Sequence, residues 1–210
     1  AVAVGFSLAI TLPRAGNIGG GGFMLVYLSD EQKTIAVDFR SSAPQNISED
    51  DFLFFKDNYD QRRYGYKASA VPGTVAGLLQ THKRFGKLSL DQILQPVIKQ
   101  AQKGIRVSYD LNQAIGSAVQ INLDEESQNI YYQKGSPIKE HSVMKRPGLA
   151  WTFREIAKNG EDAFYKGSIA KKILKAMQQN GGYISQKDLE DYKPRFAEPI
   201  ETTYRKHKVL

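Results

Sequence analysis

The 210-residue chain is 41% hydrophobic and 24% charged, which is typical of a globular protein with a sizeable core and argues against a disordered one. The formal net charge is +7, but Lys and Arg are mixed with Asp and Glu and the densest basic cluster, residues 205–208, is short, so we expect a solvated surface and no nucleic-acid partner. With no cysteine and only three widely separated histidines, the sequence predicts no disulfide, no thiol catalysis and no metal site. We also expect no cofactor.

The first element is the longest apolar run of the chain, residues 1–12, which we expect to form a buried helix that ends at Pro13. The run is well short of the roughly 20 residues that span a bilayer, and it lacks the basic start and cleavage site of a signal peptide. It predicts neither a membrane span nor a signal peptide. The chain begins without Met and ends in what resembles the start of a strand, so we expect both ends to be cuts in a longer protein.

A glycine-rich segment, NIGGGG at residues 17–22, leads from this helix into a predicted hairpin region at about residues 23–40, with strands at Phe23–Leu28 and Thr34–Phe39. Phosphate-binding loops place their glycines after a strand and before a helix, and here the order is reversed. We therefore expect the glycines to allow close backbone packing at a helix-to-strand joint, with direct ligand contact as the alternative.

Helices are predicted for most of the region from about residue 74 to residue 192. Apolar residues at helical spacing predict a helix from Thr74 that stops at Gly86. Ser89 and Gln92 resemble the capping box of a second helix, in which Pro96 marks either a kink or the start of another short helix.

The remaining elements follow from shorter signals. We expect a helical turn at Asp50–Phe55, an irregular stretch at Lys56–Ala70, and helices at 109–120, 149–158 and Ile169–Gln179, the last capped by Ser168 and ended by Gly181. Ser185 and Asp188 predict one more turn that ends at Tyr192, and a further strand is expected to start within residues 200–210.

Arg40 is the one candidate binding residue, because it comes directly after the second predicted strand in AVDFRSSAP. An arginine at the end of a strand can point into a cleft beyond the sheet, where its guanidinium suits two parallel hydrogen bonds to a carboxylate. The alternative is a structural ion pair with Asp38 or another acidic residue, and the pattern alone leaves both open.

No catalytic residue is predicted. The sequence has no G-x-S-x-G or S-x-x-K motif, and His82 lies on the apolar side of a predicted helix, where a half-buried structural role is more common than general-base catalysis. Two further patterns are weak. Tyrosines alternate with basic residues at Tyr59–Lys67, which could stack on nucleic-acid bases but is also common in ordered surface loops. Asp124–Glu126 is an acidic turn with no other metal ligands nearby in the sequence.

Six successive segments resemble the large subunit of the gamma-glutamyltransferase (gamma-glutamyltranspeptidase) family, in the order of that family and over nearly the whole chain. They are AGNIGGGGFMLV, AVDFR, VPGTVAGLLQTHKRFGK, QPVIKQAQKGI, NGEDAFYKGSIAKKI and NGGYISQKDLEDYKP. The resemblance implies an α/β (α+β) fold, part of the α/β/β/α sandwich of the N-terminal nucleophile hydrolases, with a mostly helical middle region. Residues 1–210 would then be an incomplete large-subunit fragment.

The resemblance also implies a function that explains the missing nucleophile. The precursor cuts itself, and the N-terminal threonine of the small subunit transfers the gamma-glutamyl group of substrates such as glutathione to water or to an amine. Arg40 falls on the family arginine that binds the glutamyl α-carboxylate, although Ser41 replaces the glutamate common at the next position. Thr202 and Thr203 resemble the processing-site pair only superficially, because YRKHKVL, the segment after them, is similar to a strand upstream of that site. The fragment alone is therefore expected to be inactive.

Partners and location follow from the same resemblance. We expect the small subunit of the same precursor as partner, a periplasmic or secreted full-length protein, and possible homodimers through strands that the missing subunit leaves exposed. Two alternatives remain: an acylase of the same fold acting on poly-gamma-glutamate or glutaryl amides, and a non-catalytic anion-binding module that uses Arg40 and the basic surface.

Overall fold

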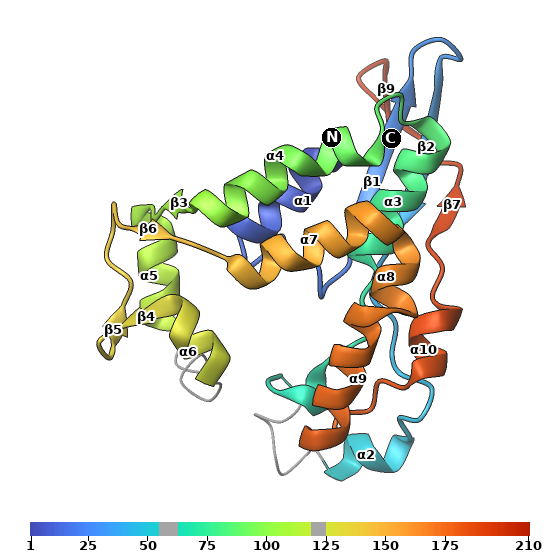
Figure 1. Ribbon diagram of the computed structural model, residues 1–210. Coiled ribbons are helices and arrows are strands. Elements are labelled where there is room, and N and C mark those ends of the chain that lie inside the picture. Colours follow the sequence, from blue (N-terminus) through green and yellow to red (C-terminus); the bar gives the residue numbers. More distant parts are fainter. Residues whose placement is uncertain (55–62, 119–124) are drawn as a thin grey trace.

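The computed structural model describes residues 1–54, 63–118 and 125–210 (Figure 1). Its helices are α1 (Val2–Thr11), α2 (Glu49–Phe54), α3 (Thr74–Phe85), α4 (Leu90–Lys103), α5 (Tyr109–Ser117), α6 (Glu125–Tyr131), α7 (Pro147–Asn159), α8 (Glu161–Tyr165), α9 (Ser168–Asn180) and α10 (Gln186–Asp191), with a short 3-10 helix at Tyr66–Ala68. Its strands are β1 (Phe23–Leu28), β2 (Lys33–Asp38), β3 (Ile105–Arg106), β4 (Tyr132–Gln133), β5 (Ser136–Pro137), β6 (Val143–Met144), β7 (Arg195–Ala197), β8 (Thr202–Tyr204) and β9 (His207–Val209). Tyr59, Arg62, Asp124 and the first part of the predicted stretch Lys56–Ala70 lie outside the described residues.

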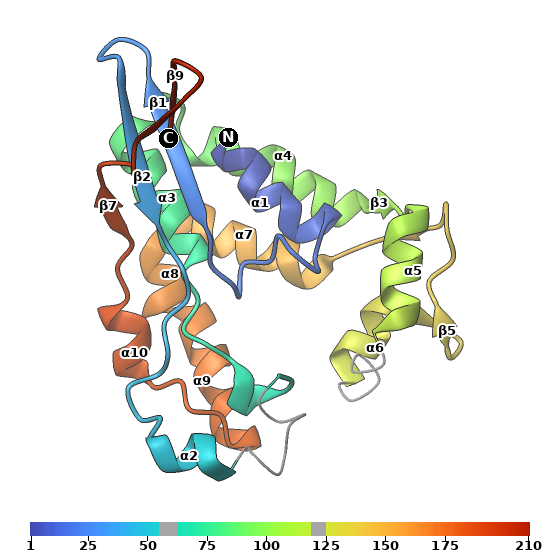
Figure 2. The ribbon, with the colours of Figure 1, turned by 180° about the vertical axis from the view of Figure 1, so that it is seen from behind.

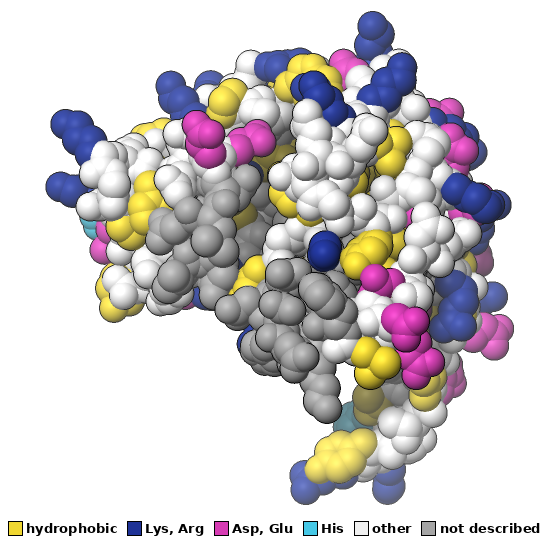
Figure 3. All heavy atoms as spheres, turned by 90° about the horizontal axis from the view of Figure 1, so that it is seen from below, with side chains coloured by type: hydrophobic (Ala, Val, Ile, Leu, Met, Phe, Trp, Pro, Cys, Tyr) yellow, Lys and Arg dark blue, Asp and Glu magenta, His cyan; other side chains and the backbone are white. Residues whose placement is uncertain are grey.

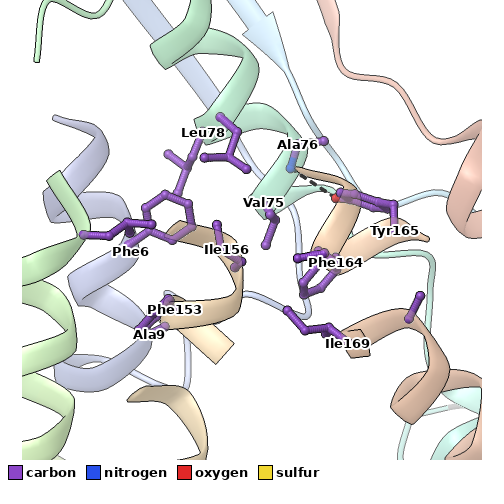
Figure 4. Packing of buried hydrophobic residues seen from close by; sticks show 14 of the residues in the cluster. Phe6, Ala9, Val75, Ala76, Leu78, Phe153, Ile156, Phe164, Tyr165 and Ile169 are labelled. Carbon is purple, nitrogen blue, oxygen red and sulfur yellow. Dashed lines mark hydrogen bonds between the residues drawn. The ribbon is translucent and has the colours of Figure 1, made fainter. Parts of the chain in front are cut away.

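The main hydrophobic core lies between helices that are far apart in the sequence. Helix α1 packs against α3 and α4, and α4 packs along α7, so that the three helices α1, α4 and α7 lie side by side (Figures 1 and 2). Phe6 of α1 meets Phe153 of α7 edge to face, with ring centroids 5.7 Å apart, and Val75 and Leu78 of α3 complete this part of the core (Figure 4). The helical period seen in the sequence is thus explained by burial of one face of each helix.

The principal sheet has the strand order β1-β2-β7, with both pairs antiparallel. The hairpin pairs Met24 with Val37, every second residue of β1 is half-buried, and Met24 packs against the helical core. The side chains between them, Phe23, Leu25 and Tyr27, are 66%, 54% and 64% exposed. One face of the sheet is therefore covered by helices, and the other presents an apolar row to solvent.

A small lobe extends from the main body and has a core of its own (Figure 1). It contains α5, α6 and the two short strand pairs β3–β6 and β4–β5, around the buried side chains of Val107, Leu111, Ile115, Ile138 and Met144. The chain enters the lobe through β3 and leaves it through β6, so these paired strands join it to α4 and α7.

Most predicted secondary structure is confirmed. The hairpin strands, the helices from Thr74 and Leu90 and the turn before Tyr192 are present, and both Ser89–Gln92 and Ser185–Asp188 form capping boxes. Gly181 ends α9 in the left-handed conformation, with a φ of 69°.

Two predictions about helices are wrong and a third is narrowed. Of the two alternatives for Pro96, the start of a second helix is wrong, because α4 continues through Pro96 from Leu90 to Lys103. Ser168 is not a cap: Gly167 precedes α9, and the Ser168 hydroxyl donates a hydrogen bond to Glu155 Oε2 of α7 at 2.5 Å. Helix α1 is buried on one side only, since Val4 is 61% exposed.

The carboxyl-terminal end also differs from the expectation of a single strand. Residues 200–210 contain the hairpin β8–β9, whose turn residues Arg205 and Lys206 have φ values of 47° and 67°. The strand that joins the principal sheet is β7, which the sequence analysis did not anticipate. No helix of the described residues is long and apolar enough to cross a membrane.

Candidate active site

Arg40 lies two residues beyond the end of β2 with an exposed side chain. Its backbone N–H donates a hydrogen bond to Asp38 Oδ1 at 3.0 Å, and its carbonyl oxygen accepts one from the Tyr192 hydroxyl at 2.9 Å. Within the described residues, the guanidinium itself forms no hydrogen bond or ion pair. The backbone of Arg40 is therefore fixed on both sides while its charged group is free to bind a ligand.

The structural ion pair between Arg40 and Asp38, left open by the sequence, does not form. The Asp38 carboxylate accepts the Arg40 backbone N–H and lies 3.8 Å from a guanidinium nitrogen of Arg195. Arg195 reaches Asp38 because β7 pairs with β2 in a register that places the two residues opposite each other. The charge of Asp38 is thus directed toward β7 and away from the Arg40 guanidinium.

The glycine segment packs directly against the Arg40 backbone. Gly22 and Phe39 exchange two backbone hydrogen bonds, of 3.2 and 2.9 Å, which extend the hairpin by one residue pair. A Cβ on Gly21 would lie 2.3 Å from the Ser41 nitrogen and 2.8 Å from the Arg40 carbonyl carbon, so no other residue fits there without a shift of the backbone. The role expected from the sequence, close packing at a joint, is confirmed.

The same segment occupies the amino-terminal end of α3. The carbonyl oxygen of Gly20 accepts hydrogen bonds from the N–H groups of Gly73 and Thr74, at 2.8 and 3.0 Å. In a phosphate-binding loop, such N–H groups at the start of a helix would instead donate to the phosphate. The arrangement holds the glycine segment against the start of α3 and leaves these two N–H groups unavailable to a phosphate.

The other candidates of the sequence analysis lie in structural positions. His82 is half-buried in the last turn of α3, and its Nε2 is 2.7 Å from the Leu88 carbonyl oxygen. Thr202 and Thr203 are exposed in β8, and Glu125 and Glu126 form the first turn of α6. Within the described residues, no group of three or more His, Cys, Asp or Glu side chains could hold a metal ion.

Figure 3 shows how the charged side chains are distributed over one face of the molecule. On that face, Lys and Arg side chains are scattered singly or in small groups, mostly around the margin, with Asp and Glu among them. A nucleic-acid interface normally requires a continuous basic patch or stripe, and the described atoms of this face do not form one.

One residue of the site was missed by sequence reasoning. Tyr192 is 152 positions from Arg40 and contacts it only because α10 and β7 return to the hairpin. A tyrosine at the end of a short helix carries no local signal for such a contact.

Comparison with known proteins shows to which family the chain belongs. A family model described as "Gamma-glutamyltranspeptidase" matches residues 1–210. The chain belongs to the gamma-glutamyltranspeptidase family. It is 41% identical to the glutathione hydrolase proenzyme of Escherichia coli over 214 aligned residues, which is all of this chain and 37% of that protein.

Solved structures place the gamma-glutamyltranspeptidase chain in the N-terminal nucleophile hydrolase fold. The gamma-glutamyltranspeptidase of Helicobacter pylori matches with a TM-score of 0.94 and 35% identity over 99% of this chain and 60% of that one. A cephalosporin acylase from Bacillus halodurans matches with a TM-score of 0.89 and 27% identity, over 99% of this chain and 40% of that one. The predicted family and fold class are confirmed, and the chain spans little more than a third of the curated relative described above.

Proposed function

We propose that the whole protein transfers or hydrolyses gamma-glutamyl groups of glutathione and other gamma-glutamyl amides, and that Arg40 binds the α-carboxylate of the glutamyl group. The observation that carries the proposal is the free guanidinium on an anchored backbone at the end of β2. A planar, permanently charged fork held in place is well suited to bind a carboxylate through two hydrogen bonds. The chain's membership of the gamma-glutamyltranspeptidase family supplies the reaction class.

In the proposed reaction, Arg40 holds the end of the substrate that does not react. The N-terminal threonine of a small subunit, cut from the same precursor, would attack the gamma-glutamyl carbonyl carbon. Its α-amino group would take the hydroxyl proton and return it to the departing amine as the C–N bond breaks. Water or an amino-acid or peptide amine would then accept the acyl group from the threonine oxygen. Without that threonine, we expect the chain alone to be inactive.

The open face of the principal sheet supports a partner of this kind. Strand β1 is an edge strand of its sheet, and its exposed apolar row adjoins a pocket of about 410 Å³ that Leu25, Ala36, Ile200 and Leu210 help to line. An apolar face of this sort is normally covered by another layer of structure. We propose that it receives the small subunit, and that copies lacking the small subunit form homodimers through the same strands. Light scattering of the isolated chain at rising concentration tests for the homodimer. A chain that stays strictly monomeric would contradict it.

The cellular location and the substrate range are also proposed from membership of the family. We propose a periplasmic or secreted full-length protein, to be tested by immunoblotting of cell fractions with antibody to this chain. The acylase match favours one alternative, an enzyme of the same fold that acts on poly-gamma-glutamate or glutaryl amides. The relative rates of hydrolysis of gamma-glutamyl, glutaryl and poly-gamma-glutamyl amides distinguish these enzymes.

The decisive experiment is to determine the N-termini of the mature chains of the native protein by mass spectrometry. A second chain that begins with threonine is expected. A single uncut chain would contradict the enzyme proposal and favour the anion-binding module. In that case, phosphate would protect Arg40 from an arginine-modifying reagent as well as glutamate does, whereas the proposed enzyme requires specific protection by glutamate.

A further inference from the structure

Tyr192 directly follows α10, and its hydroxyl occupies a notch beside the Arg40 backbone. Gly73 makes the notch possible: a Cβ at that position would lie 2.1 Å from the Tyr192 hydroxyl oxygen and 2.0 Å from the Phe39 carbonyl oxygen. The hydroxyl is therefore confined between α3 and the end of β2, where it donates its hydrogen bond to the Arg40 carbonyl at 2.9 Å.

The ring of Tyr192 is held by the core of the protein. It stacks on the ring of Tyr165, with centroids 5.9 Å apart and planes 6° apart. Tyr165 is itself buried, donates to the Pro72 carbonyl at 2.8 Å and accepts the Ala76 N–H at 3.1 Å, the bond drawn in Figure 4. The position of the Tyr192 hydroxyl is thus determined by α3 and α8 together.

The segment that carries Tyr192 also holds the other side of Arg40. Three residues later, Arg195 pairs with Asp38, whose carboxylate accepts the Arg40 N–H. Gly21 lies against the same peptide groups from the glycine segment. The contacts reach the backbone of Arg40 from three directions and leave its side chain free, which is what a residue that orients a ligand requires.

We infer that Tyr192 is a positioning residue for Arg40, and through it a determinant of affinity for the α-carboxylate of the gamma-glutamyl donor. The inference rests on the proposed function, in which Arg40 binds that carboxylate. Burial, followed by the negative charge of Asp38, raises the pKa of Tyr192 to about 12, so the hydroxyl keeps its proton and remains a donor at neutral pH.

The test is Tyr192→Phe in the full-length, self-processed enzyme, assayed with a gamma-glutamyl anilide. Phenylalanine keeps the stack on Tyr165 and removes only the hydroxyl, so folding and self-cleavage should be retained and the thermal midpoint should fall by a few degrees at most, as for one lost hydrogen bond. We expect KM to rise about fivefold, because a less ordered Arg40 has to be fixed when the carboxylate binds, with kcat within twofold, because Arg40 holds the carboxylate in the ground state and the transition state alike. Tyr183→Phe is the matched control: its hydroxyl also donates to a neighbour, Asp51 Oδ1 at 2.9 Å, and its KM should not change.

A second comparison separates positioning from a general structural effect. Arg40→Ala should raise KM strongly, and adding Tyr192→Phe to that variant should raise it no further, because the positioned group is gone. If Arg40→Ala leaves KM unchanged, the proposed role of Arg40 is wrong. The inference alone is overturned if Arg40→Ala raises KM and Tyr192→Phe does not, or if the tyrosine substitution has its full effect in both backgrounds.

Discussion

Gly77 of α3 lies so close to Phe39 that a Cβ on the glycine would be 2.2 Å from the Cγ atom of the phenylalanine ring. The absence of a side chain at Gly77 lets the helix approach the end of β2, one residue before Arg40. Gly73, one turn earlier, allows the same approach to the Phe39 carbonyl oxygen. The position of Arg40 therefore depends on how closely α3 packs against the hairpin.

We expect Gly77→Ala to destabilise the protein by about 1–3 kcal/mol, because Phe39 is buried and has to shift to make room. Gly148→Ala is the matched control, since Gly148 also lies in a helix but has no atom within 4 Å of its Cβ position. There alanine should be neutral or stabilising by up to about 1 kcal/mol. Urea unfolding of both variants measures the difference, and equal effects at the two positions would contradict the packing argument.

Arg40→Lys should lower kcat/KM of the self-processed enzyme about 30-fold, mostly through KM. Lysine keeps the charge but replaces two parallel hydrogen bonds by a point contact, a loss of about 2 kcal/mol. Arg14→Lys is the control, because Arg14 is an exposed arginine that pairs with Asp110 at 3.0 Å. Steady-state kinetics with a gamma-glutamyl donor compares them; an unchanged KM in Arg40→Lys would remove the bidentate contact from the proposed mechanism.

Asp188 should make the stability of the protein depend on pH in the acid range. Burial would raise its pKa, but hydrogen bonds from the Ser185 hydroxyl, the Gln45 N–H and the Ser185 N–H outweigh burial and hold the pKa below the usual 3.8. A carboxylate whose pKa is lower in the folded state stabilises the fold above its unfolded pKa, and this contribution is lost as the pH falls through the folded pKa.

Asp188→Asn should therefore cost about 1–2 kcal/mol at pH 7 and progressively less below pH 4. Urea unfolding of both proteins at a series of pH values between 7 and 3 gives this difference. Asp110→Asn, at an exposed ion pair, should change little at any of these values. A cost for Asp188→Asn that stayed constant down to pH 3 would show that the charge of Asp188 is not what stabilises the α10 cap.

Pro96→Ala should stabilise the protein by about 1 kcal/mol. Proline lacks the N–H that would bond to the Gln92 carbonyl, and α4 continues past it with Pro96 on the exposed side. The gain should be smaller than the full difference in helix propensity, about 3 kcal/mol, because the helix has already adapted to the ring. Thermal unfolding of this variant beside Lys99→Ala, at an exposed position of the same helix, makes the comparison. A lower midpoint for Pro96→Ala would indicate that the proline restricts the unfolded chain more than it strains the helix.

Sequence patterns predicted what depends on neighbours within one or two turns. The capping boxes at Ser89 and Ser185 and the left-handed stop at Gly181 each involve residues no more than four positions apart. Such signals fail at Ser168. It lies next to the predicted helix start, as a cap would, but its hydroxyl donates to Glu155 of α7, which only folding brings close. A side chain with the spacing of a cap can instead form its hydrogen bond with a residue of another helix, and then it does not cap.

The sequence by itself determined the hairpin, most helices, the family and Arg40 as the candidate ligand-binding residue, because periodicity, turn chemistry and resemblance are all readable along the chain. Only the tertiary structure decided that the Arg40 guanidinium is free of Asp38, that Gly21 packs on its backbone and that Tyr192 holds its carbonyl oxygen. These contacts join residues as far as 152 positions apart. They exist only after β7 has paired with β2 and α3 has packed against Phe39, and no local free-energy preference encodes a contact of that range.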